Sequence, residues 1–232
     1  TVFGLSVVFP CKGQVKDGDK IILAPEGPAE VQWEFNVKHI EKVNHRYWYF
    51  TSSDGTLKDE VLAKIDGDGI PEIESKRLAG VEIKKPATLV LKHVNQSYNG
   101  SYEFHVGAGS GSGGGVFTVT VIIAEKPKVT VNCSSTNQVI EGENFRCLCK
   151  GEEGNPAPAD VTWFGNNGQP IGTGKGEILL TFNNVTRAKS GNYKCEAKTH
   201  EQAKNETSIQ LTVQYEPDIT RFISSPAKPV VG

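Results

Sequence analysis

Short segments in which apolar and polar residues alternate recur along the whole chain. Single polar residues separate Val31, Trp33 and Phe35, and another separates Tyr102 from Phe104. Further segments of this kind are Ile21–Leu23, Phe117–Val121, Val129–Val131, Phe145–Cys149, Val161–Trp163, Leu180–Phe182 and Leu211–Val213. Glycine, asparagine, aspartate and proline interrupt them, and helical periodicity is nearly absent. A period of two predicts half-buried strands, so we expect an all-β chain built as a sandwich or a barrel.

A long-period repeat indicates that the chain contains two copies of one unit. The apolar run Leu89–Val94 precedes Tyr102, and the similar run Leu179–Val185 precedes Tyr193, 91 positions after the first tyrosine. That spacing is about the length of one small sandwich domain. The repeat therefore predicts two sandwiches in tandem.

The boundary between the two units is expected at the polar segment Ala124–Pro127, whose proline interrupts strand pairing. This predicts one domain over residues 1–124 and a second over 125–215. The short linker predicts that the two domains do not swivel freely. Residues 216–232 begin like the entry to the second domain, so they are either the first strand of a third domain or a membrane-proximal stalk.

Composition narrows the classes of function. The net charge of −2 and a pI near 6.2 argue against a nucleic-acid binder, which needs a basic patch. No stretch of eighteen apolar residues occurs, so membrane attachment is expected only through a segment outside this chain. The chain start lacks the basic and apolar regions of a signal peptide.

Cysteines and glycosylation sequons point to an extracellular protein. Four of the five cysteines lie between residues 133 and 195, and none forms a C-x-x-C pair, which argues against zinc and redox motifs. Asn-x-Ser/Thr triplets occur at Asn95, Asn99, Asn132, Asn184 and Asn205. Together these features favour a cell-surface or secreted protein carrying N-linked glycans.

The second half resembles the immunoglobulin superfamily. Trp163 follows Cys149 by fourteen positions, and Tyr193 stands two residues before Cys195. The resemblance covers about residues 127–215 and implies an intermediate-type sandwich. In that fold a disulfide joins strands B and F, a tryptophan on strand C packs on it, and the tyrosine makes a corner hydrogen bond. Lys189 stands where the family usually has an aspartate, which puts the corner salt bridge in doubt.

Two further cysteines are left after the implied Cys149–Cys195 pair. Cys147 has the same parity as Cys149, so both side chains should point inward. Cys133, on the preceding strand, is the nearest partner for Cys147, and we predict that bridge; a buried free Cys147 is the alternative. Cys11 remains unpaired and is expected to be buried and inert rather than intermolecular.

The first half resembles a variable-type immunoglobulin domain without its disulfide. Trp33 is expected on strand C, and Tyr102 matches the tyrosine corner. Phe104 stands where the second cysteine belongs, and Leu23 or Pro25 is expected at the first cysteine position on strand B. The aromatic run at residues 47–50 is predicted to be strand C′. The Gly-rich run at residues 107–115 is predicted to be the F–G loop, either native or an introduced linker.

A variable-type domain without these cysteines, followed by an intermediate-type domain with extra ones, resembles the hydrozoan Alr allorecognition receptors. The resemblance implies a single-pass membrane receptor ectodomain. It also implies a protein partner, an identical copy on an opposing cell, bound homophilically by the distal domain. A heterophilic receptor and a secreted binding protein are the alternatives.

Strand alternation predicts which side chains of the first domain meet a partner. If the signature aromatics point inward, their neighbours on the GFCC′ sheet point outward. The predicted binding face consists of Gln32, Glu34, Asn36, Tyr47, Tyr49, Glu103 and His105. Polar groups around aromatic anchors are typical of interfaces, and a solvated sheet face is the alternative.

No pattern in the chain predicts catalysis or a cofactor. The acidic stretch with Asp66, Asp68 and Glu72 lacks the spacing of an EF-hand and is interpreted as a turn rather than a calcium site. The histidines at 39, 45, 93, 105 and 200 accompany no nucleophile motif. We therefore expect a binding protein, not an enzyme, with no metal.

Overall fold

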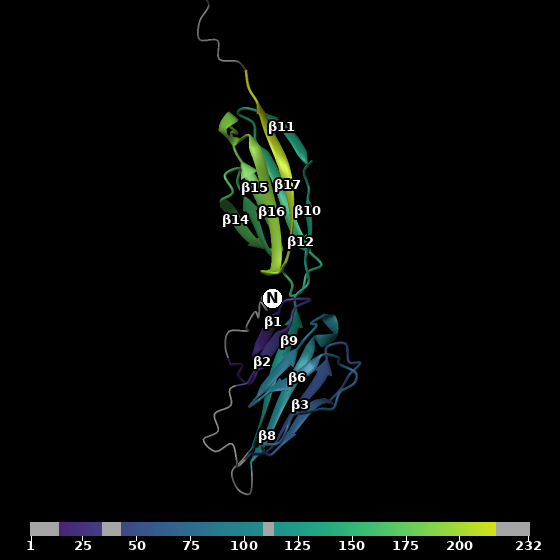
Figure 1. Ribbon diagram of the computed structural model, residues 1–232. Helices are drawn as coiled ribbons and strands as arrows, with labels where there is room; N and C mark the ends of the chain where they lie inside the picture. The colour runs from purple at the N-terminus through teal and green to yellow at the C-terminus, as the bar shows by residue number, and fades with distance from the viewer. Residues whose placement is uncertain (1–13, 34–42, 109–113, 217–232) are drawn as a thin grey trace, which may run out of the picture.

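The computed structural model describes residues 14–33, 43–108 and 114–216, and within them the chain is all-β, with two sandwiches joined end to end (Figure 1). In the first sandwich, one sheet is ordered β1 (Lys20–Leu23), β9 (Gly114–Ile123), β8 (Gly100–Ala108), β3 (Val43–Ser52), β4 (Glu60–Asp66) and β5 (Glu72–Ile73). The facing sheet is ordered β2 (Ala29–Gln32), β7 (Thr88–Leu91) and β6 (Val81–Lys84).

The second sandwich has the same two-layer plan. One sheet is ordered β10 (Lys128–Val131), β12 (Phe145–Glu152) and β15 (Glu177–Phe182). The other is ordered β11 (Thr136–Ile140), β17 (Ala203–Gln214), β16 (Gly191–His200), β13 (Asp160–Phe164) and β14 (Pro170–Lys175). The described residues of each domain thus form the two facing sheets that the sequence predicts.

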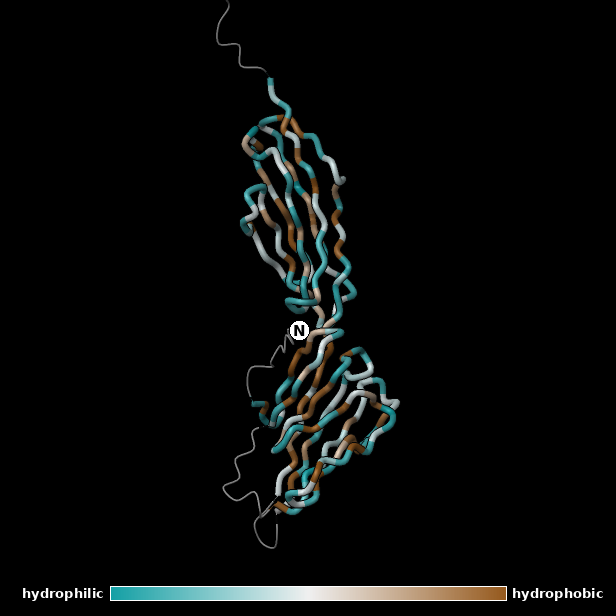
Figure 2. Tube along the Cα trace, in the orientation of Figure 1, coloured by the Kyte–Doolittle hydropathy of each residue, from teal (hydrophilic) through white to brown (hydrophobic). Residues whose placement is uncertain are grey.

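Alternation decides which side chains form each core. On β3, Trp48 and Phe50 are fully buried, whereas Tyr47 and Tyr49, which alternate with them, are only half-buried. Figure 2 shows hydrophobic and hydrophilic residues alternating along strands of both sandwiches. Burying one face of each strand removes apolar surface from water and is the main term that holds the two layers together.

Both tyrosine corners form. The Tyr102 hydroxyl donates to the Tyr98 carbonyl at 2.9 Å, and the Tyr193 hydroxyl donates to the Lys189 carbonyl at 2.8 Å. Each acceptor ends a short 3₁₀ turn, η2 (Gln96–Tyr98) or η3 (Arg187–Lys189), which precedes strand β8 or β16. The corner of the second domain uses a backbone carbonyl, so the replacement of aspartate by Lys189 leaves it intact.

The second domain contains two disulfides, Cys149–Cys195 and Cys133–Cys147. The first joins β12 to β16 across the core, and the second ties the residues after β10 to β12. Trp163 lies opposite Cys195 in the ladder, and its indole nitrogen donates to the Ile178 carbonyl at 3.3 Å. Both pairings agree with the predictions. Cys11 lies outside the described residues.

Three strand assignments predicted for the first domain are wrong. Trp33 continues strand β2, which pairs with β7 and is therefore strand B, and the strand opposite β8 is β3, which carries Trp48. The run at 47–50 is thus strand C, not C′, and β4 is C′. Neither Leu23 nor Pro25 holds the first cysteine position; Leu23 lies on β1, beside β9. The alternation of apolar and polar residues identifies a strand but not the strand with which it pairs, which explains the errors.

Register shows which residues replace the missing disulfide. In the first domain Val31 pairs with Leu89, and in the second domain Cys147 pairs with Leu180 in the equivalent place. The next inward position on these two strands is therefore Trp33 in the first domain and Cys149 in the second. Opposite them, Trp48 pairs with Phe104 as Trp163 pairs with Cys195. Trp33 and Phe104 therefore occupy the two cysteine positions.

An aromatic cluster fills the space that the disulfide would span. The Phe104 ring lies 5.7 Å from Trp33, 5.0 Å from Trp48 and 6.3 Å from Phe117, measured between ring centroids. The first three of these side chains are at most 1% exposed. Tilted aromatic pairs at such distances stabilise a core beyond simple burial.

The junction between the sandwiches is held by hydrogen bonds. The Glu125 amide donates to the Asn155 carbonyl at 2.8 Å, and the Asn155 side chain donates to the Ile123 carbonyl at 3.2 Å. The Thr199 hydroxyl donates to the Glu125 carbonyl at 2.6 Å. These bonds tie the linker to Asn155 and to strand β16 of the second domain. Within the described ranges, no helix has the length and apolar character needed to cross a membrane.

Candidate protein-binding face

The outward face of the β9-β8-β3-β4 sheet carries a group of aromatic and charged side chains. Tyr49 lies opposite Glu103, and Tyr47 lies opposite His105, on neighbouring strands. The Tyr49 and His105 rings are 4.5 Å apart between centroids. Four of the seven side chains predicted for the binding face are thus adjacent.

The side chains of His45, Tyr47, Tyr49 and His105 form an aromatic row that runs toward the end of the sheet. The His45 ring stacks on Tyr47 at 5.0 Å, and Tyr47 meets Tyr49 edge-on at 6.3 Å. His45 lies over the strand at Gly107, where an added Cβ would come within 2.1 Å of the imidazole. A side chain at 107 would therefore displace His45, so this glycine is needed to keep the ring against the sheet.

Charges of both signs border the aromatic row. Glu103 and His105 lie 2.8 Å apart, and each side chain is about a third exposed. The Tyr47 hydroxyl donates to an Asp66 carboxylate oxygen at 3.2 Å. Partial desolvation, together with this carboxylate, raises the pKa of the Tyr47 phenol. The phenol therefore stays neutral and keeps its hydrogen bond to Asp66.

A shallow pocket of about 300 Å³ opens beside the tyrosines, lined by Tyr47, Tyr49, Val61, Lys64 and Glu74. Lys64 bridges Glu72 at 3.2 Å and Glu74 at 2.9 Å. Hydrogen bonds to these carboxylates raise the pKa of the Lys64 ammonium, so it stays charged. An apolar floor with a fixed charged rim is a usual arrangement in a protein-binding surface.

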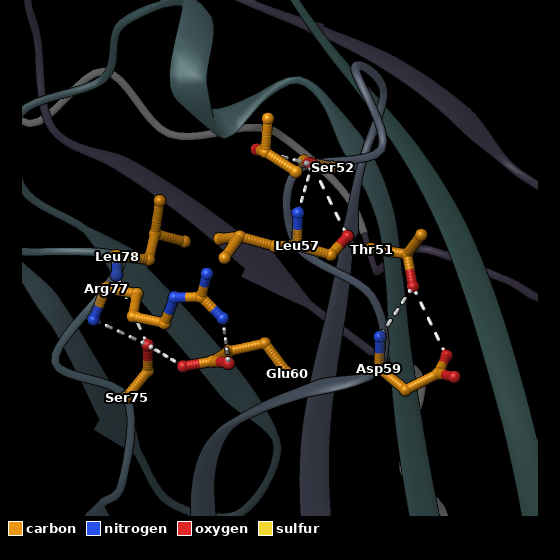
Figure 3. A network of polar contacts seen from close by, with 9 residues as sticks. Thr51, Ser52, Leu57, Asp59, Glu60, Ser75, Arg77 and Leu78 are labelled. Carbon is orange, nitrogen blue, oxygen red and sulfur yellow. Dashed lines mark hydrogen bonds and ion pairs between the residues drawn. The ribbon is translucent and has the colours of Figure 1, made fainter.

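The turn that joins β3 to β4 is fixed by polar contacts (Figure 3). The Ser52 hydroxyl donates to Asp54 at 2.6 Å and accepts from the Leu57 amide at 2.9 Å. On the next strand, Glu60 accepts from the Ser75 hydroxyl at 2.9 Å and pairs with Arg77 at 3.7 Å. These bonds hold the two strands that carry the tyrosines and the pocket in one arrangement.

The remaining predicted face residues do not join this group. Gln32 lies on β2, in the opposite sheet, because Trp33 belongs to strand B; its place on the binding face is a wrong prediction. Glu34 and Asn36 lie outside the described residues. The structure adds His45, Val61 and Lys64, of which His45 could have been found because it is in phase with Tyr47.

The corresponding face of the second domain differs in chemistry. Its outward side chains pair with each other: Lys194 with Glu206 at 2.9 Å, and Lys204 with Glu196 at 3.2 Å. The Lys194–Glu206 pair is exposed on both sides, and exposed pairs contribute little energetically. The aromatic row is therefore a property of the first domain.

The acidic turn after β4 shows no calcium-like arrangement. The Lys85 ammonium lies 3.2 Å from the Asp68 carboxylate and also donates to the Asp68 carbonyl. Asp66 accepts from Tyr47. Among the described residues no group of three or more potential metal ligands comes together. Of the Gly-rich run, positions 107–108 belong to β8 and 114–115 to β9, while 109–113 fall outside the described ranges.

Comparison with known protein families finds a match within the second sandwich. A family model described as an immunoglobulin domain matches residues 126–199. Residues 126–199 are therefore similar in sequence to an immunoglobulin domain. This match agrees with the disulfide that joins the two sheets and with the tyrosine corner. No catalytic family is indicated.

Curated proteins similar to this chain include a junctional adhesion molecule and a limbic system-associated membrane protein. Rat limbic system-associated membrane protein is 33% identical over 112 residues, which cover 47% of this chain and 31% of that protein. Human junctional adhesion molecule B is 30% identical over 126 residues, covering 47% and 41%. Human ADAMTS-like protein 1 is 42% identical over 82 residues, covering 34% and 4%. The chain thus spans less than half the length of these relatives.

Solved structures extend the likeness to both sandwiches. Murine CEACAM1b has a TM-score of 0.56 at 14% identity, with 83% of this chain and 96% of that one covered. The titin I-band fragment I67–I69 has a TM-score of 0.55 at 17% identity, covering 86% and 64%. At these identities the likeness shows the fold alone, tandem immunoglobulin-like sandwiches.

Proposed function

We propose that this chain is the recognition part of a cell-surface adhesion receptor, and that it binds protein through the outward face of the β9-β8-β3-β4 sheet. The aromatic row of His45, Tyr47, Tyr49 and His105 beside the 300 Å³ pocket carries the proposal. Tyrosine is enriched where proteins meet because a large rigid ring is buried while its hydroxyl keeps a partner. On the corresponding face of the second domain, the Lys194 ammonium lies over the half-buried Phe164 ring at 5.0 Å and charged side chains pair with each other.

The position of the row suits contact with an opposing surface. Strand β8 begins at Gly100, near the junction with the second domain, and runs away from it. His105 and His45 therefore lie toward the end of the first sandwich that is remote from the second. A receptor held through its C-terminal side would present this end outward, on the extracellular side of the cell membrane.

An identical copy is the partner that we propose. In a two-fold contact the same face meets itself, so it must carry groups that complement each other. This face carries Lys64 and His105 as well as Glu103 and Glu74. A small rotation then decides whether unlike or like charges meet, which can make pairing specific. The resemblance to Alr receptors favours the same reading, discrimination of self from non-self.

Glycans at the five sequons would leave this face open. Asn95 and Asn99 flank the η2 turn, at the junction end of the first sandwich, and the other three sequons lie in the second domain. Glycans at these positions would cover the ends and sides of the molecule. Weak single contacts on the free face would add up between cells through multivalency.

Bead aggregation tests the proposal directly. Beads of two colours, all coated with the wild-type chain, should form mixed clusters. Tyr49→Ala on both bead populations should abolish clustering, because it removes the ring between the pocket and His105. Tyr215→Ala is the matched control: it removes an exposed tyrosine in the second domain and should cluster like wild type.

Two results would contradict the proposal. If Tyr49→Ala beads cluster as well as wild type, the aromatic face is not the binding surface. If identical beads never cluster but join beads carrying another protein, the chain is a heterophilic receptor or a secreted binding protein.

A further inference from the structure

One sheet of the second domain has an open edge, whereas the equivalent edge in the first domain is covered by an additional strand. Strand β15 is the last strand of the β10-β12-β15 sheet, and no strand pairs with its other side within residues 114–216. In the first domain the equivalent strand, β7, is covered by β6, with Val81 opposite Leu91 and Ile83 opposite Leu89.

The chain leaves no room to cover this edge in the second domain. Strand β14 ends at Lys175 and β15 begins at Glu177, so only Gly176 crosses between the two sheets. Its amide donates to the Ala159 carbonyl, and its carbonyl accepts from the Gly151 amide, both at 2.8 Å. A strand corresponding to β6 has no residues from which to form.

Apolar side chains are exposed along the same edge. Leu179 is 49% exposed and Ile171, on the adjacent β14, is 48% exposed. Between the two strands lies a groove of about 200 Å³, whose lining includes Trp163 and Phe182. By contrast, all four residues of β7 in the first domain are buried. Unpaired backbone groups next to exposed apolar side chains are the usual prerequisites for strand addition.

The usual protection against edge pairing is missing from β15. Natural edge strands carry lysine, proline or inward charges. Strand β14 begins with Pro170 and ends with Lys175, and β10 begins with Lys128. The stretch Ile178–Phe182 contains no charge and no proline. Its free edge therefore favours pairing instead of preventing it.

We propose that β15 pairs with β15 of a second copy of this chain, antiparallel about a two-fold axis at Leu179. In this register Leu179 meets its symmetry mate on the outer face, Ile178 lies opposite the partner's Leu180, and Glu177 lies opposite the partner's Thr181. The strand is self-complementary, because the two Glu177 carboxylates end up about 14 Å apart, four residues at about 3.4 Å each. That separation exceeds the screening length of about 8 Å in physiological salt.

Pairing along a single strand sets the strength of this contact. Five or six residues of edge bury less than the 1,200 Å² or so of a stable soluble complex. The association is therefore weak in dilute solution and becomes populated when many chains are held on one surface, where the effective concentration is high. The edge lies in the second domain, so it leaves the aromatic face of the first domain free.

Cross-linking on a supported bilayer tests this contact with the full chain, attached through a C-terminal tag. Leu179→Cys, in a Cys11→Ser background that removes the other unpaired thiol, should form a disulfide-linked dimer under mild oxidation. Ile140→Cys in the same background is the matched control, since Ile140 is an exposed apolar residue on β11 of the same domain. We expect at least tenfold faster cross-linking at 179 than at 140.

A second measurement avoids cysteine chemistry. Energy transfer between labelled wild-type chains on one bilayer should be lost with Leu179→Lys, which places like charges at the axis, and kept with Ile140→Lys. Thermal unfolding of both variants checks that they are folded. Equal cross-linking at the two positions, no energy transfer for wild type, or binding of only a different chain at this edge would overturn the proposal. None of these outcomes affects bead clustering, which depends on the first domain.

Discussion

Phe104→Ala should destabilise the first domain strongly while leaving the second unaffected. Phe104 is fully buried and contacts the rings of Trp33, Trp48 and Phe117 at centroid distances of 5.0–6.3 Å. Truncating a buried phenylalanine to alanine costs about 3–5 kcal/mol through lost burial and the cavity left behind. The loss of three aromatic contacts, each worth about 0.5–1.5 kcal/mol, places this site at the upper end of that range.

This cost is large compared with the stability of a domain, which is on the order of 5–15 kcal/mol. It is also comparable to the roughly 2–5 kcal/mol that a native disulfide contributes to a small domain. The aromatic cluster and the Cys149–Cys195 bridge should therefore have similar weight in their own domains but respond differently to a reductant.

Urea unfolding followed by tryptophan fluorescence separates the two domains. Trp33 and Trp48 lie in the first domain and Trp163, the last of the three tryptophans, lies in the second. In a Trp163→Phe background the signal reports the first domain alone. Phe104→Ala should lower the unfolding free energy by about 4–5 kcal/mol. Phe164→Ala, a half-buried phenylalanine of the second domain, should leave this transition unchanged.

Reduction provides the complementary measurement. A reductant should leave the first-domain transition in place and lower that of the second domain, because both disulfides of the described residues lie in the second domain. If Phe104→Ala changed stability by less than about 1 kcal/mol, or if reduction lowered the first-domain transition, the idea that the aromatic cluster replaces the disulfide would be refuted.

Three further predictions follow from particular contacts. Hydrogen bonds, first from the Ser52 hydroxyl, lower the pKa of Asp54 to about 2, below its ordinary value of 3.8. The resulting stabilisation is present above pH 3.8 and is lost as the pH falls through about 2, so Asp54→Asn should flatten the plot of unfolding midpoint against pH in this acid range and nowhere else. Gly107→Ala should displace the His45 ring and reduce bead clustering, whereas a variant that clusters normally would show that the ring position is irrelevant. Tyr102→Phe removes one buried hydrogen bond and should lower the unfolding free energy of the first domain by about 1 kcal/mol; no change in urea unfolding would contradict a stabilising corner.

The sequence alone determined the elements that depend on local pattern. Alternation marked the strands, and the Tyr102 and Tyr193 repeat predicted both corners. In the second domain, Cys149, Trp163 and Cys195 identified the fold, because each signature residue has a fixed place on a strand. Cys133 and Cys147 could be paired by strand adjacency. These inferences succeeded because they needed only the face of the strand to which a side chain points and the identity of its nearest neighbours along the chain.

Which strands become neighbours was decided by the tertiary structure. Trp33 and Trp48 have the same alternating surroundings, so the sequence could not tell strand B from strand C, and Gln32 was placed on the wrong sheet. Only the pairing of β2 with β7 and of β3 with β8 put Trp33 opposite Phe104 across the core. The stacking of His45 over Gly107 and the open edge of β15 were equally hidden. Each depends on contacts between residues far apart in the chain, and parity within a strand carries no information about them.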